Sequence, residues 1–394
     1  MSERFTQIIA RVEQFLVNIS YLRCVRSKAN TTMKITIVSG ARPNFMKIAP
    51  IVHAVEAAQQ AGKDISYRLV YTGKQDDESI EPSLFADLEM RMPDVYLGVD
   101  CANHSQLAAG IMLAFDKELT ENPTQVVLVV DDLTATMSCA IVAKKMGIKV
   151  AHLVAGTRSF DMNMPKEVNR MITDGLSDYL FTAGASENRN LFHTGRDNDN
   201  VYYVGNILID TIRYNRKRLK QPALAIDFNI EDCKYLLLTL NRRKLLSQRE
   251  KIKKLLETLS SGCFDTPIIA PVHAYVSESI KELGLNLPNI HILPVQSYLT
   301  FGYLISHAKA IVTDSGNVSE EATFFGIPCI TLNNFAEHPE TCQVGTNELV
   351  GEDSEVLAKA LDVLNKGDWK KGTIPELWDG HTGERIIKIL LGEN

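Results

Sequence analysis

The chain has 394 residues, of which 45% are hydrophobic and 23% charged, and its formal net charge is −6. This length exceeds what one compact core holds and predicts two domains of ~150–200 residues each. The acidic balance argues against nucleic acid or an anionic membrane as the main partner, because binding along a phosphate surface needs an excess of Lys and Arg.

The cysteines indicate the cellular compartment. Seven of them are scattered along the chain without a CxxC pair, which disfavours both a disulfide framework and a structural zinc site. A reducing compartment is the simplest interpretation, and no stretch of ~20 apolar residues could cross a bilayer. We therefore expect a cytoplasmic protein that binds neither membranes nor nucleic acids.

Residues 1–32 are expected to be a separate N-terminal helical extension. From Phe5 onward, apolar residues recur at steps of three and four, which predicts an amphipathic helix. Arg11 and Glu13 interrupt the apolar run, so the segment does not resemble a secretory signal. Three interpretations remain open: a helix docked on the body, a helix at a subunit interface, or an extension that precedes a natural start at Met33.

A β-α-β rhythm predicts a first domain over residues 33–208. Short apolar runs alternate with helical stretches, and such continuous runs are typical of strands buried on both faces of a parallel sheet. Parallel strands need right-handed crossover connections, so helices should cover the sheet. The expected strands are Lys34–Ser39, Tyr67–Tyr71, Val126–Val130, Lys149–Leu153, Tyr179–Thr182 and Val201–Val204.

A second α/β series predicts another domain over residues 209–375, and residues 376–394 are expected to form a helix that packs back on the first domain. Two Rossmann-like αβα domains in tandem place a central cleft at the carboxyl ends of their sheets, where open α/β folds bind ligands. The expected strands of the second domain are Tyr235–Leu240, Pro267–Pro271, Ile290–Leu293, Ala310–Thr313 and Cys329–Leu332.

The turn after the first strand, Gly40–Lys47, carries the first candidate site. Pro43 suits a first helical position, and Arg42 and Lys47 bring positive charge to the start of this helix. Cations beside a helix N-terminus favour an anion site, although solvated side chains at an ordinary turn remain an alternative. The turn lacks the GxGxxG pattern of dinucleotide-binding folds, which disfavours a dehydrogenase.

Two aspartates follow the most apolar strand. We expect Asp131 to cap the next helix, because aspartate is a favoured N-cap residue. We expect Asp132 to transfer protons, because buried apolar walls raise the pKa of a carboxylate towards the working pH. A chemical role for Asp131 and a capping role for Asp132 remain the alternatives.

Two other positions at strand ends leave their roles open. The cluster Pro165–Arg170 opens a helix with Glu167 in its first turn, where compensation of the helix dipole accounts for a carboxylate as well as chemistry does. His273 follows a strand of the second domain, and a structural role is the favoured interpretation for such a lone histidine.

The stretch Thr313–Ala322 (TDSGNVSEEA) is the most specific motif in the chain. A strand is expected to end at Thr313 and a helix to begin near Ser319, so the amides of residues 315–317 should form an anion site. A carboxylate in the first helical turn can accept hydrogen bonds from both ribose hydroxyls. The motif therefore predicts a nucleotide site, and the absence of a Walker lysine disfavours an ATPase.

Together and in this order, these motifs resemble those of the non-hydrolysing UDP-N-acetylglucosamine 2-epimerases and of relatives that act on other UDP-HexNAc sugars. The similarity runs from about Met33 to Gly351. The family motifs GTRPE-IK, HGDT, H-EAG-R, PEE-NR, T-HR, DSGG-EEA and ERPE correspond here to GARPNFMK, VVDDLTAT, HLVAGTR, PKEVNR, TLNRR, TDSGNVSEEA and EHPE.

The resemblance implies a fold and a reaction. The fold is the two-domain glycosyltransferase-B type, and the reaction interconverts UDP-GlcNAc and UDP-ManNAc, or a related UDP-HexNAc pair, through elimination and re-addition of UDP. A base must remove the C2 proton, donors must hold the diphosphate, and a closed cleft must exclude water. The resemblance further implies a UDP-sugar as the ligand, no metal or redox cofactor, and a homodimer.

The resemblance also implies site residues. Asp132 corresponds to a catalytic acid of the family, and Glu321 corresponds to the carboxylate that binds ribose. Arg42 and Lys47 correspond to the basic pair near the diphosphate and sugar, Arg170 to the arginine that ends PEE-NR, and Phe301 to the aromatic residue beside the uracil. Ser315 and Gly316 correspond to the phosphate turn, where Asn317 is also assigned to substrate binding. His273 is assigned to substrate binding from its place at a strand end and not from the resemblance.

Several positions depart from the family pattern. Val154 and Lys166 replace two catalytic glutamates, and Asn241 replaces a histidine that could shuttle protons. Glu167 could substitute in catalysis through a shift of backbone or rotamer, and Asn241 could still form a hydrogen bond. Three hypotheses follow: a divergent epimerase, a catalytically impaired paralogue that binds a UDP-sugar, and a UDP-sugar hydrolase or transferase on the same scaffold. Further replacements are Asn44 for Glu, Asn317 for Gly and His338 for Arg.

Overall fold

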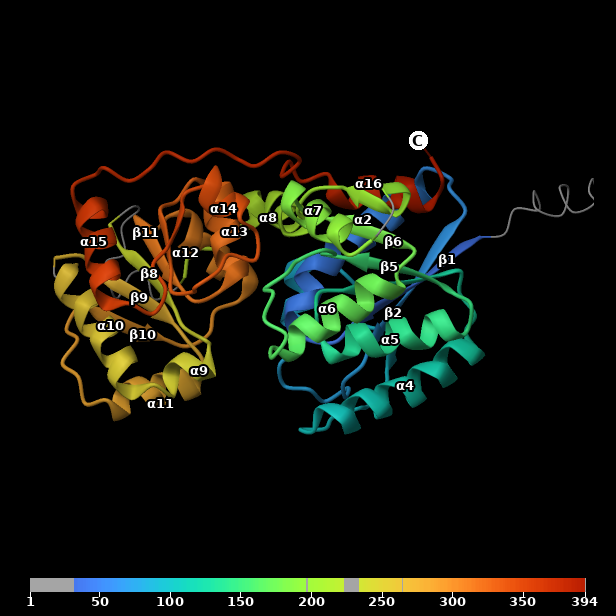
Figure 1. Cartoon of the computed structure of the whole chain (residues 1–394), viewed down its shortest axis with the longest axis horizontal. Helices are drawn as coiled ribbons and strands as arrows, with labels where there is room; N and C mark the ends of the chain where they lie inside the picture. The colour runs from blue at the N-terminus through green and yellow to red at the C-terminus, as the bar shows by residue number, and fades with distance from the viewer. Residues whose placement is uncertain (1–31, 196–197, 223–233, 264, 394) are drawn as a thin grey trace, which may run out of the picture.

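The computed structural model describes residues 32–195, 198–222, 234–263 and 265–393, which form two lobes side by side (Figure 1). The helix expected to start near Phe5 lies outside the described residues. Helices and strands alternate along both lobes. Across the described ranges, no helix combines the length and the apolar character needed to cross a lipid bilayer.

The first lobe is built on a parallel seven-stranded sheet with strand order β3-β2-β1-β4-β5-β6-β7. Its strands are β1 (Met33–Ser39), β2 (Ile65–Tyr71), β3 (Val95–Tyr96), β4 (Val126–Val130), β5 (Lys149–Leu153), β6 (Tyr179–Thr182) and β7 (Val201–Tyr203). Its helices are α2 (Arg42–Gln60), α3 (Pro82–Leu88), α4 (His104–Glu121), α5 (Thr134–Lys145), α6 (Pro165–Leu176), α7 (Ala185–His193) and α8 (Ile207–Asn215), with short 3₁₀ turns η1 (Asn198–Asn200) and η2 (Arg216–Arg218).

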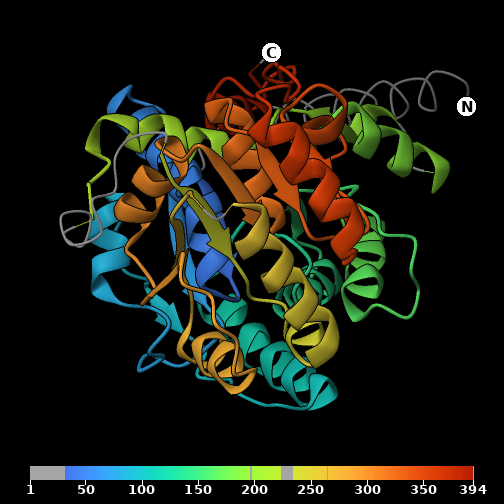
Figure 2. The ribbon, with the colours of Figure 1, turned by 90° about the vertical axis from the view of Figure 1, so that its left-hand side faces the viewer.

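The second lobe is built on a parallel six-stranded sheet with strand order β10-β9-β8-β11-β12-β13. Helices α10 and α15 lie side by side on this lobe (Figure 2). Its strands are β8 (Leu236–Thr239), β9 (Ile268–Pro271), β10 (Ile290–Leu293), β11 (Ala310–Thr313), β12 (Cys329–Thr331) and β13 (Asn347–Leu349). Its helices are α9 (Arg243–Leu246), α10 (Arg249–Gly262), α11 (Ala274–Glu282), α12 (Tyr298–Ser306), α13 (Gly316–Phe325), α14 (Glu340–Gln343) and α15 (Ser354–Asn365).

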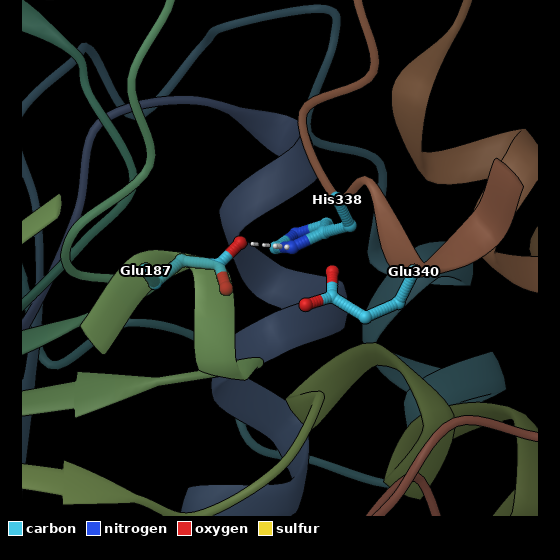
Figure 3. A group of neighbouring side chains, drawn as sticks. All are labelled: Glu187, His338 and Glu340. Carbon is cyan, nitrogen blue, oxygen red and sulfur yellow. Dashed lines mark hydrogen bonds and ion pairs between the residues drawn. The ribbon is translucent and has the colours of Figure 1, made fainter. Parts of the chain in front are cut away.

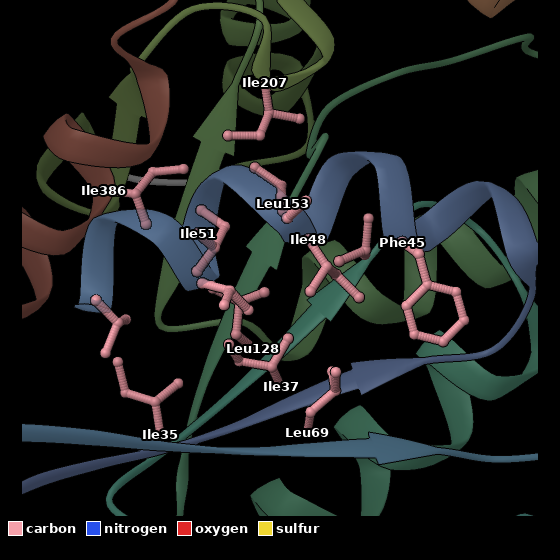
Figure 4. Packing of buried hydrophobic residues seen from close by; sticks show 14 of the residues in the cluster. Ile35, Ile37, Phe45, Ile48, Ile51, Leu69, Leu128, Leu153, Ile207 and Ile386 are labelled. Carbon is pink, nitrogen blue, oxygen red and sulfur yellow. The ribbon is translucent and has the colours of Figure 1, made fainter. Parts of the chain in front are cut away.

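Burial on both faces of the sheets accounts for the continuous apolar runs. In β4, the side chains of Val126, Leu128 and Val130 belong to the hydrophobic cluster that packs against α2 (Figure 4). Val127 and Val129 belong to the cluster on the opposite face of the same sheet. A strand packed on both faces leaves no site for a polar side chain, and the prediction of two parallel αβα domains is confirmed.

The C-terminal helix α16 (Thr382–Leu390) returns from the second lobe to the first (Figure 1). Ile386 and Leu390 belong to the buried cluster of the first lobe, and Figure 4 shows Ile386 among its members. Gly383 permits the close packing, because a Cβ at this position would lie 2.7 Å from the carbonyl oxygen of Pro50 on α2. The amide of Gly383 also donates to Asp210 of α8 at 2.7 Å. The last helix of the chain is therefore part of the first lobe's core.

Candidate functional site

Loops at the carboxyl ends of the first sheet meet a segment of the second lobe around a small cavity. Its volume is about 20 Å³, enough for roughly one water molecule. We call it the interlobe cavity. It brings together three residues that the sequence assigned to the site, Lys47, Asp132 and Arg170. The complete lining consists of Lys47, Asp131, Asp132, Val154, Thr157 and Arg170 from the first lobe, and Glu337 and His338 from the second.

An ion pair forms one wall of the interlobe cavity. The ammonium nitrogen of Lys47, on α2, lies 2.6 Å from Oδ1 of Asp131, and Asn44 donates to Oδ2 of the same carboxylate at 2.8 Å. Burial alone would lower the pKa of Lys47, but the carboxylates of Asp131, Glu320 and Glu337 raise it above its usual value. Lys47 therefore remains a cation inside the cavity.

The expectation that Asp131 caps a helix is wrong. Helix α5 begins at Thr134, and Leu133 occupies the N-cap position without a side-chain hydrogen bond. Asp131 adopts a left-handed backbone conformation, with φ of 60°, which aspartate tolerates better than most residues. Its carboxylate is bound instead by Lys47, which lies 84 positions away in the sequence.

Asp132 pairs with two cations from α6. Its Oδ2 accepts hydrogen bonds from Nη2 and Nε of Arg170 at 2.6 and 3.0 Å, and its Oδ1 lies 3.1 Å from Nζ of Lys166. Burial raises the pKa of Asp132, but Lys166 and Arg170 outweigh this effect and hold the pKa below its usual value. The expected rise of this pKa is therefore wrong, and the carboxylate remains ionised.

Val154 has a strained backbone at the interlobe cavity. Its φ is +69°, a conformation that β-branched residues rarely adopt and that costs of the order of 1–3 kcal/mol. The valine brings no group that could transfer a proton. A carboxylate nevertheless lies beside it, because the amide of Asp131 donates to the carbonyl oxygen of Leu153 at 3.2 Å. Asp131 and Val154 thus line the same cavity from neighbouring strand ends.

Glu167 supports a loop and does not line the interlobe cavity. Its Oε2 accepts hydrogen bonds from the amide and hydroxyl of Ser159 at 2.8 and 2.9 Å, and from Arg170 at 3.1 Å. Burial raises the pKa of Glu167, but these donors lower it below its usual value. Glu167 therefore does not lie where it could take over the role of the catalytic glutamate that Lys166 replaces.

The predicted phosphate turn lies at the start of α13. The helix begins at Gly316 and not near Ser319 as expected, because Ser315 already has the extended backbone of an N-cap residue. The amides of Gly316 and Asn317 therefore belong to the first helical turn, where N–H groups lack partners within the helix. A Cβ at Gly316 would lie 2.7 Å from Oε2 of Glu337, so the turn borders the interlobe cavity.

Glu321 is a buried carboxylate in the second turn of α13. It is 6% exposed, and burial together with the neighbouring Glu320 raises its pKa to about 8. Within the described ranges, no hydrogen bond reaches its carboxylate. It lies near Tyr298, whose pKa is raised by burial and by this carboxylate. Buried acceptors are normally hydrogen-bonded, so Glu321 is available to a ligand hydroxyl.

The remaining predicted residues lie outside the lining of the interlobe cavity. Arg42 is the first residue of α2 and forms no ion pair within the described part of the chain. Asn241 follows β8 and is exposed, and its backbone N–H donates to Oδ2 of Asp314 at 2.8 Å. His273 is the exposed N-cap residue of α11, and Phe301 packs against the core of the second lobe.

A buried charge cluster joins the lobes beside the interlobe cavity. Nδ1 of His338 lies 3.0 Å from Oε1 of Glu187 on α7 (Figure 3). Nε2 of His338 lies 3.7 Å from Oε1 of Glu320 on α13. Burial lowers the pKa of His338, but Glu320 and Glu187 raise it to about 9. Arg170 adds an ion pair between the lobes, 3.6 Å from Glu337. The sequence analysis assigned no role to Glu337, although this residue begins the EHPE stretch that corresponds to the family motif ERPE.

A larger cavity of about 610 Å³ lies on the first lobe, beyond the ends of β1 and β2. Gly40, Lys74, Asp77, His104 and Thr134 are among its lining residues. None of the residues assigned to catalysis or substrate binding lines this cavity. This cavity could have been anticipated from the sequence, because Thr72-Gly73-Lys74 follows β2 as the GARP turn follows β1.

Comparison with known proteins places this geometry in context. The sequence profile of the UDP-N-acetylglucosamine 2-epimerase family matches residues 57–391. A UDP-N-acetylglucosamine 2-epimerase of Methanocaldococcus jannaschii is 34% identical over 370 residues, covering 91% of this chain and 99% of the relative. A UDP-2,3-diacetamido-2,3-dideoxy-D-glucuronate 2-epimerase of Pseudomonas aeruginosa is 30% identical, covering 83% of this chain and 91% of the relative.

Solved structures with the same fold include two that hold ligands. The M. jannaschii UDP-GlcNAc 2-epimerase in complex with UDP-GlcNAc and UDP has a TM-score of 0.79 and 34% identity, covering 91% of this chain and all of that one. The Neisseria meningitidis UDP-GlcNAc 2-epimerase bound to UDP-GlcNAc has a TM-score of 0.81 and 25% identity, covering 92% of this chain and all of that one. The expected two-lobed glycosyltransferase-B arrangement is confirmed by these structures.

Proposed function

This chain belongs to the UDP-N-acetylglucosamine 2-epimerase family, and from that premise we propose that it interconverts UDP-GlcNAc and UDP-ManNAc, or a related UDP-HexNAc pair. The observation that carries the proposal is the composition of the interlobe cavity. Two buried cations, Lys47 and Arg170, lie there beside the carboxylates of Asp131, Asp132 and Glu337. Cations that can hold a departing diphosphate next to carboxylates that can accept a proton are what UDP elimination requires.

The reaction balances without an outside reactant. An ionised carboxylate removes the proton at C2, the electron pair of that bond forms the C1–C2 double bond, and the C1–O bond breaks with its electrons on UDP. Re-addition of UDP to C1 and return of a proton to C2 from the opposite face give the epimer. Asp132 is held ionised by Lys166 and Arg170, and Asp131 lies at the wall where Val154 has no such group. We assign proton transfer to these two aspartates.

We assign nucleotide binding to the second lobe. The first turn of α13 offers the amides of Gly316 and Asn317 to the phosphates, and Glu321 offers a carboxylate to the ribose hydroxyls. Ser315, the N-cap residue, is assigned to the same phosphate turn, although its amide donates to the hydroxyl of Thr313. Phe301 remains assigned to the uracil, and His273 to substrate binding without a stated part of the ligand. In the first lobe, we assign Arg42 and Lys47 to the diphosphate and sugar, and Arg170 to substrate binding.

A second candidate function is UDP-sugar binding without turnover. It is favoured by the ion pair of Lys166 with Asp132 and by the apolar side chain of Val154, both at positions where the family motifs have glutamate. The remaining alternative, a UDP-sugar hydrolase or transferase on this scaffold, predicts release or transfer of the sugar without reversible epimer formation.

One incubation separates these functions. With UDP-GlcNAc in D₂O, the proposal predicts deuterium at C2 and appearance of the C2 epimer by NMR. Binding without turnover predicts UDP affinity by calorimetry with no deuterium, and activity gained on Val154→Glu, Lys166→Glu and Asn241→His together would show that the scaffold is otherwise competent. Absence of exchange with every UDP-HexNAc tested would overturn the epimerase proposal.

The setting of the enzyme is also part of the proposal. We assign it to the cytoplasm, to a homodimer and to the supply of sugars for polysaccharide biosynthesis. The free thiols of Cys101, Cys139, Cys263, Cys329 and Cys342 support a reducing compartment. No separate cofactor is required by the reaction as written above.

A further inference from the structure

Three potential metal ligands meet where the lobes join. Glu187 comes from α7 of the first lobe, whereas His338 and Glu340 come from the second (Figure 3). Each offers one donor atom, and these atoms all lie within 4.8 Å of one another. Nδ1 of His338 is 3.0 Å from Oε1 of Glu187. Bonds of ~2.0–2.2 Å to a common ion place neighbouring donor atoms roughly 3.0–3.5 Å apart. The distance between His338 and Glu187 suits a shared ion, and the donor atom of Glu340 lies within 4.8 Å of both.

One oxygen of Glu340 lacks a donor at this junction, whereas Glu187 is bound by His338. The hydroxyl of Ser186 lies 2.9 Å from Oε2 of Glu187 and 2.9 Å from Oε1 of Glu340, but its single proton can serve only one of them. Oε2 of Glu340 is buried and has no hydrogen-bond partner within the described residues. Both carboxylates also converge on Gly184, where a Cβ would overlap their oxygens. Figure 3 shows the two carboxylates directed towards each other below the imidazole ring.

We propose that Glu187, His338 and Glu340 bind a divalent transition-metal ion of the Zn²⁺ or Mn²⁺ class, which fastens the second lobe to the first. Imidazole nitrogen together with carboxylate oxygen favours such ions over Mg²⁺, which prefers oxygen alone and keeps its waters. The site shares His338 with the interlobe cavity, but the elimination chemistry itself needs no metal. Its effect is on how firmly the lobes hold together.

Another carboxylate lies behind the imidazole ring. Oε1 of Glu320 is buried, has no hydrogen bond to any residue that the structure describes, and lies 3.7 Å from Nε2 of His338. Oε2 of Glu320 is bound by Asn206. At 3.7 Å this carboxylate supplies negative charge behind the ring but no hydrogen bond, and the other ring nitrogen is the one that can face the metal. Here that nitrogen is Nδ1, which faces Glu187.

The test is calorimetry on the full chain after treatment with a chelator, with no nucleotide present. We expect one Zn²⁺ or Mn²⁺ per chain, binding at least tenfold more tightly than Mg²⁺, and a higher Tm with the bound ion. Glu340→Gln should weaken this binding by about tenfold or more while keeping the side chain's shape, and His338→Gln should do the same. His193→Gln, an exposed histidine on the same helix as Glu187, is the matched control and should bind like the native chain.

Two results would overturn the site. One is the absence of a stoichiometric ion on the native chain. The other is unchanged affinity in Glu340→Gln, which would place the ion elsewhere. If circular dichroism shows that His338→Gln does not fold, Glu340→Gln alone tests the site. Glu340 is only partly buried, so its replacement should keep the fold. Since no UDP-sugar takes part, this outcome is independent of the epimerase activity.

Discussion

Lys47 and Asp131 are held together inside the protein, with side chains 7% and 17% exposed. Removing one member of such a pair leaves the other charge without compensation, at a cost of about 3–5 kcal/mol, whereas removing both is often close to neutral. We therefore predict that Asp131→Asn lowers the free energy of unfolding by about 3 kcal/mol, measured by urea denaturation. Asparagine tolerates the left-handed backbone at this position, so strain does not confuse the comparison.

The control is the double variant Lys47→Met with Asp131→Asn. Because it removes both charges, it should be more stable than Asp131→Asn alone. If the two single effects simply add, the residues are not coupled and the ion pair does not stabilise the fold.

The raised pKa of Glu321 predicts that the stability of the fold depends on pH. Its pKa of about 8 in the folded chain lies above the ordinary glutamate value of 4.5, so between these values the folded state holds a proton that the unfolded state has lost. Its contribution to stability is therefore present below pH 4.5 and is lost as the pH rises towards 8. Urea unfolding at several pH values should show a flatter decline for Glu321→Gln. The exposed Glu355→Gln should keep the native slope, and an unchanged slope in Glu321→Gln would contradict the assignment.

Single residues also mark the limit of prediction from sequence. Lys47 and Asp132 could be placed at one site because both follow strands of one parallel sheet. The partner of Asp131 and the lowered pKa of Asp132 could not be predicted, because they depend on Lys47 and Lys166, which other elements supply. The positive φ of Val154 could not be predicted from the sequence, since valine rarely adopts that backbone conformation.

At the scale of elements, α16 shows how the end of the chain stabilises its beginning. Ile386 is fully buried in the first-lobe cluster, so Ile386→Ala should lower the free energy of unfolding by about 2–4 kcal/mol. Lys388→Ala, exposed on the same helix, should change it by less than about 0.5 kcal/mol. Denaturation followed by circular dichroism measures both. Equal effects from the two variants would show that α16 is not part of the core.

Long apolar runs made most strands predictable. β1, β4, β8 and β11 all stand out because they are buried on both faces. β3 and β13 have two and three residues, too few to carry a pattern. The start of α13 was misplaced because Ser315 and Ser319 are both acceptable caps, and only the backbone of Ser315 decides between them.

At the scale of the whole molecule, the lobes meet too closely for a nucleotide sugar to enter the interlobe cavity, which has room for about one water. The sugar therefore needs more room in the interlobe cavity than this arrangement of the lobes leaves. A ligand that binds only the folded chain stabilises it by about 2.7 kcal/mol at a hundred times its Kd. UDP should accordingly raise the Tm of the native chain.

Gly316→Val should abolish this rise in Tm, because its side chain would meet Glu337 and cover the amides of the first turn of α13. Gly175→Ala adds a methyl group in open space on α6 and should leave the response to UDP intact. Thermal unfolding with and without UDP measures both variants. Retention of the full response in Gly316→Val would show that UDP binds elsewhere.

The central claim is that UDP is held between the lobes, with its phosphates at the start of α13 and its leaving end beside Lys47 and Arg170. A crystal structure of the complex with UDP tests it most directly. The account predicts diphosphate density within hydrogen-bond distance of the amides of Gly316 and Asn317, and ribose hydroxyls on Glu321. Density for UDP in the first-lobe cavity beside Lys74 and His104, with the start of α13 empty, would contradict it.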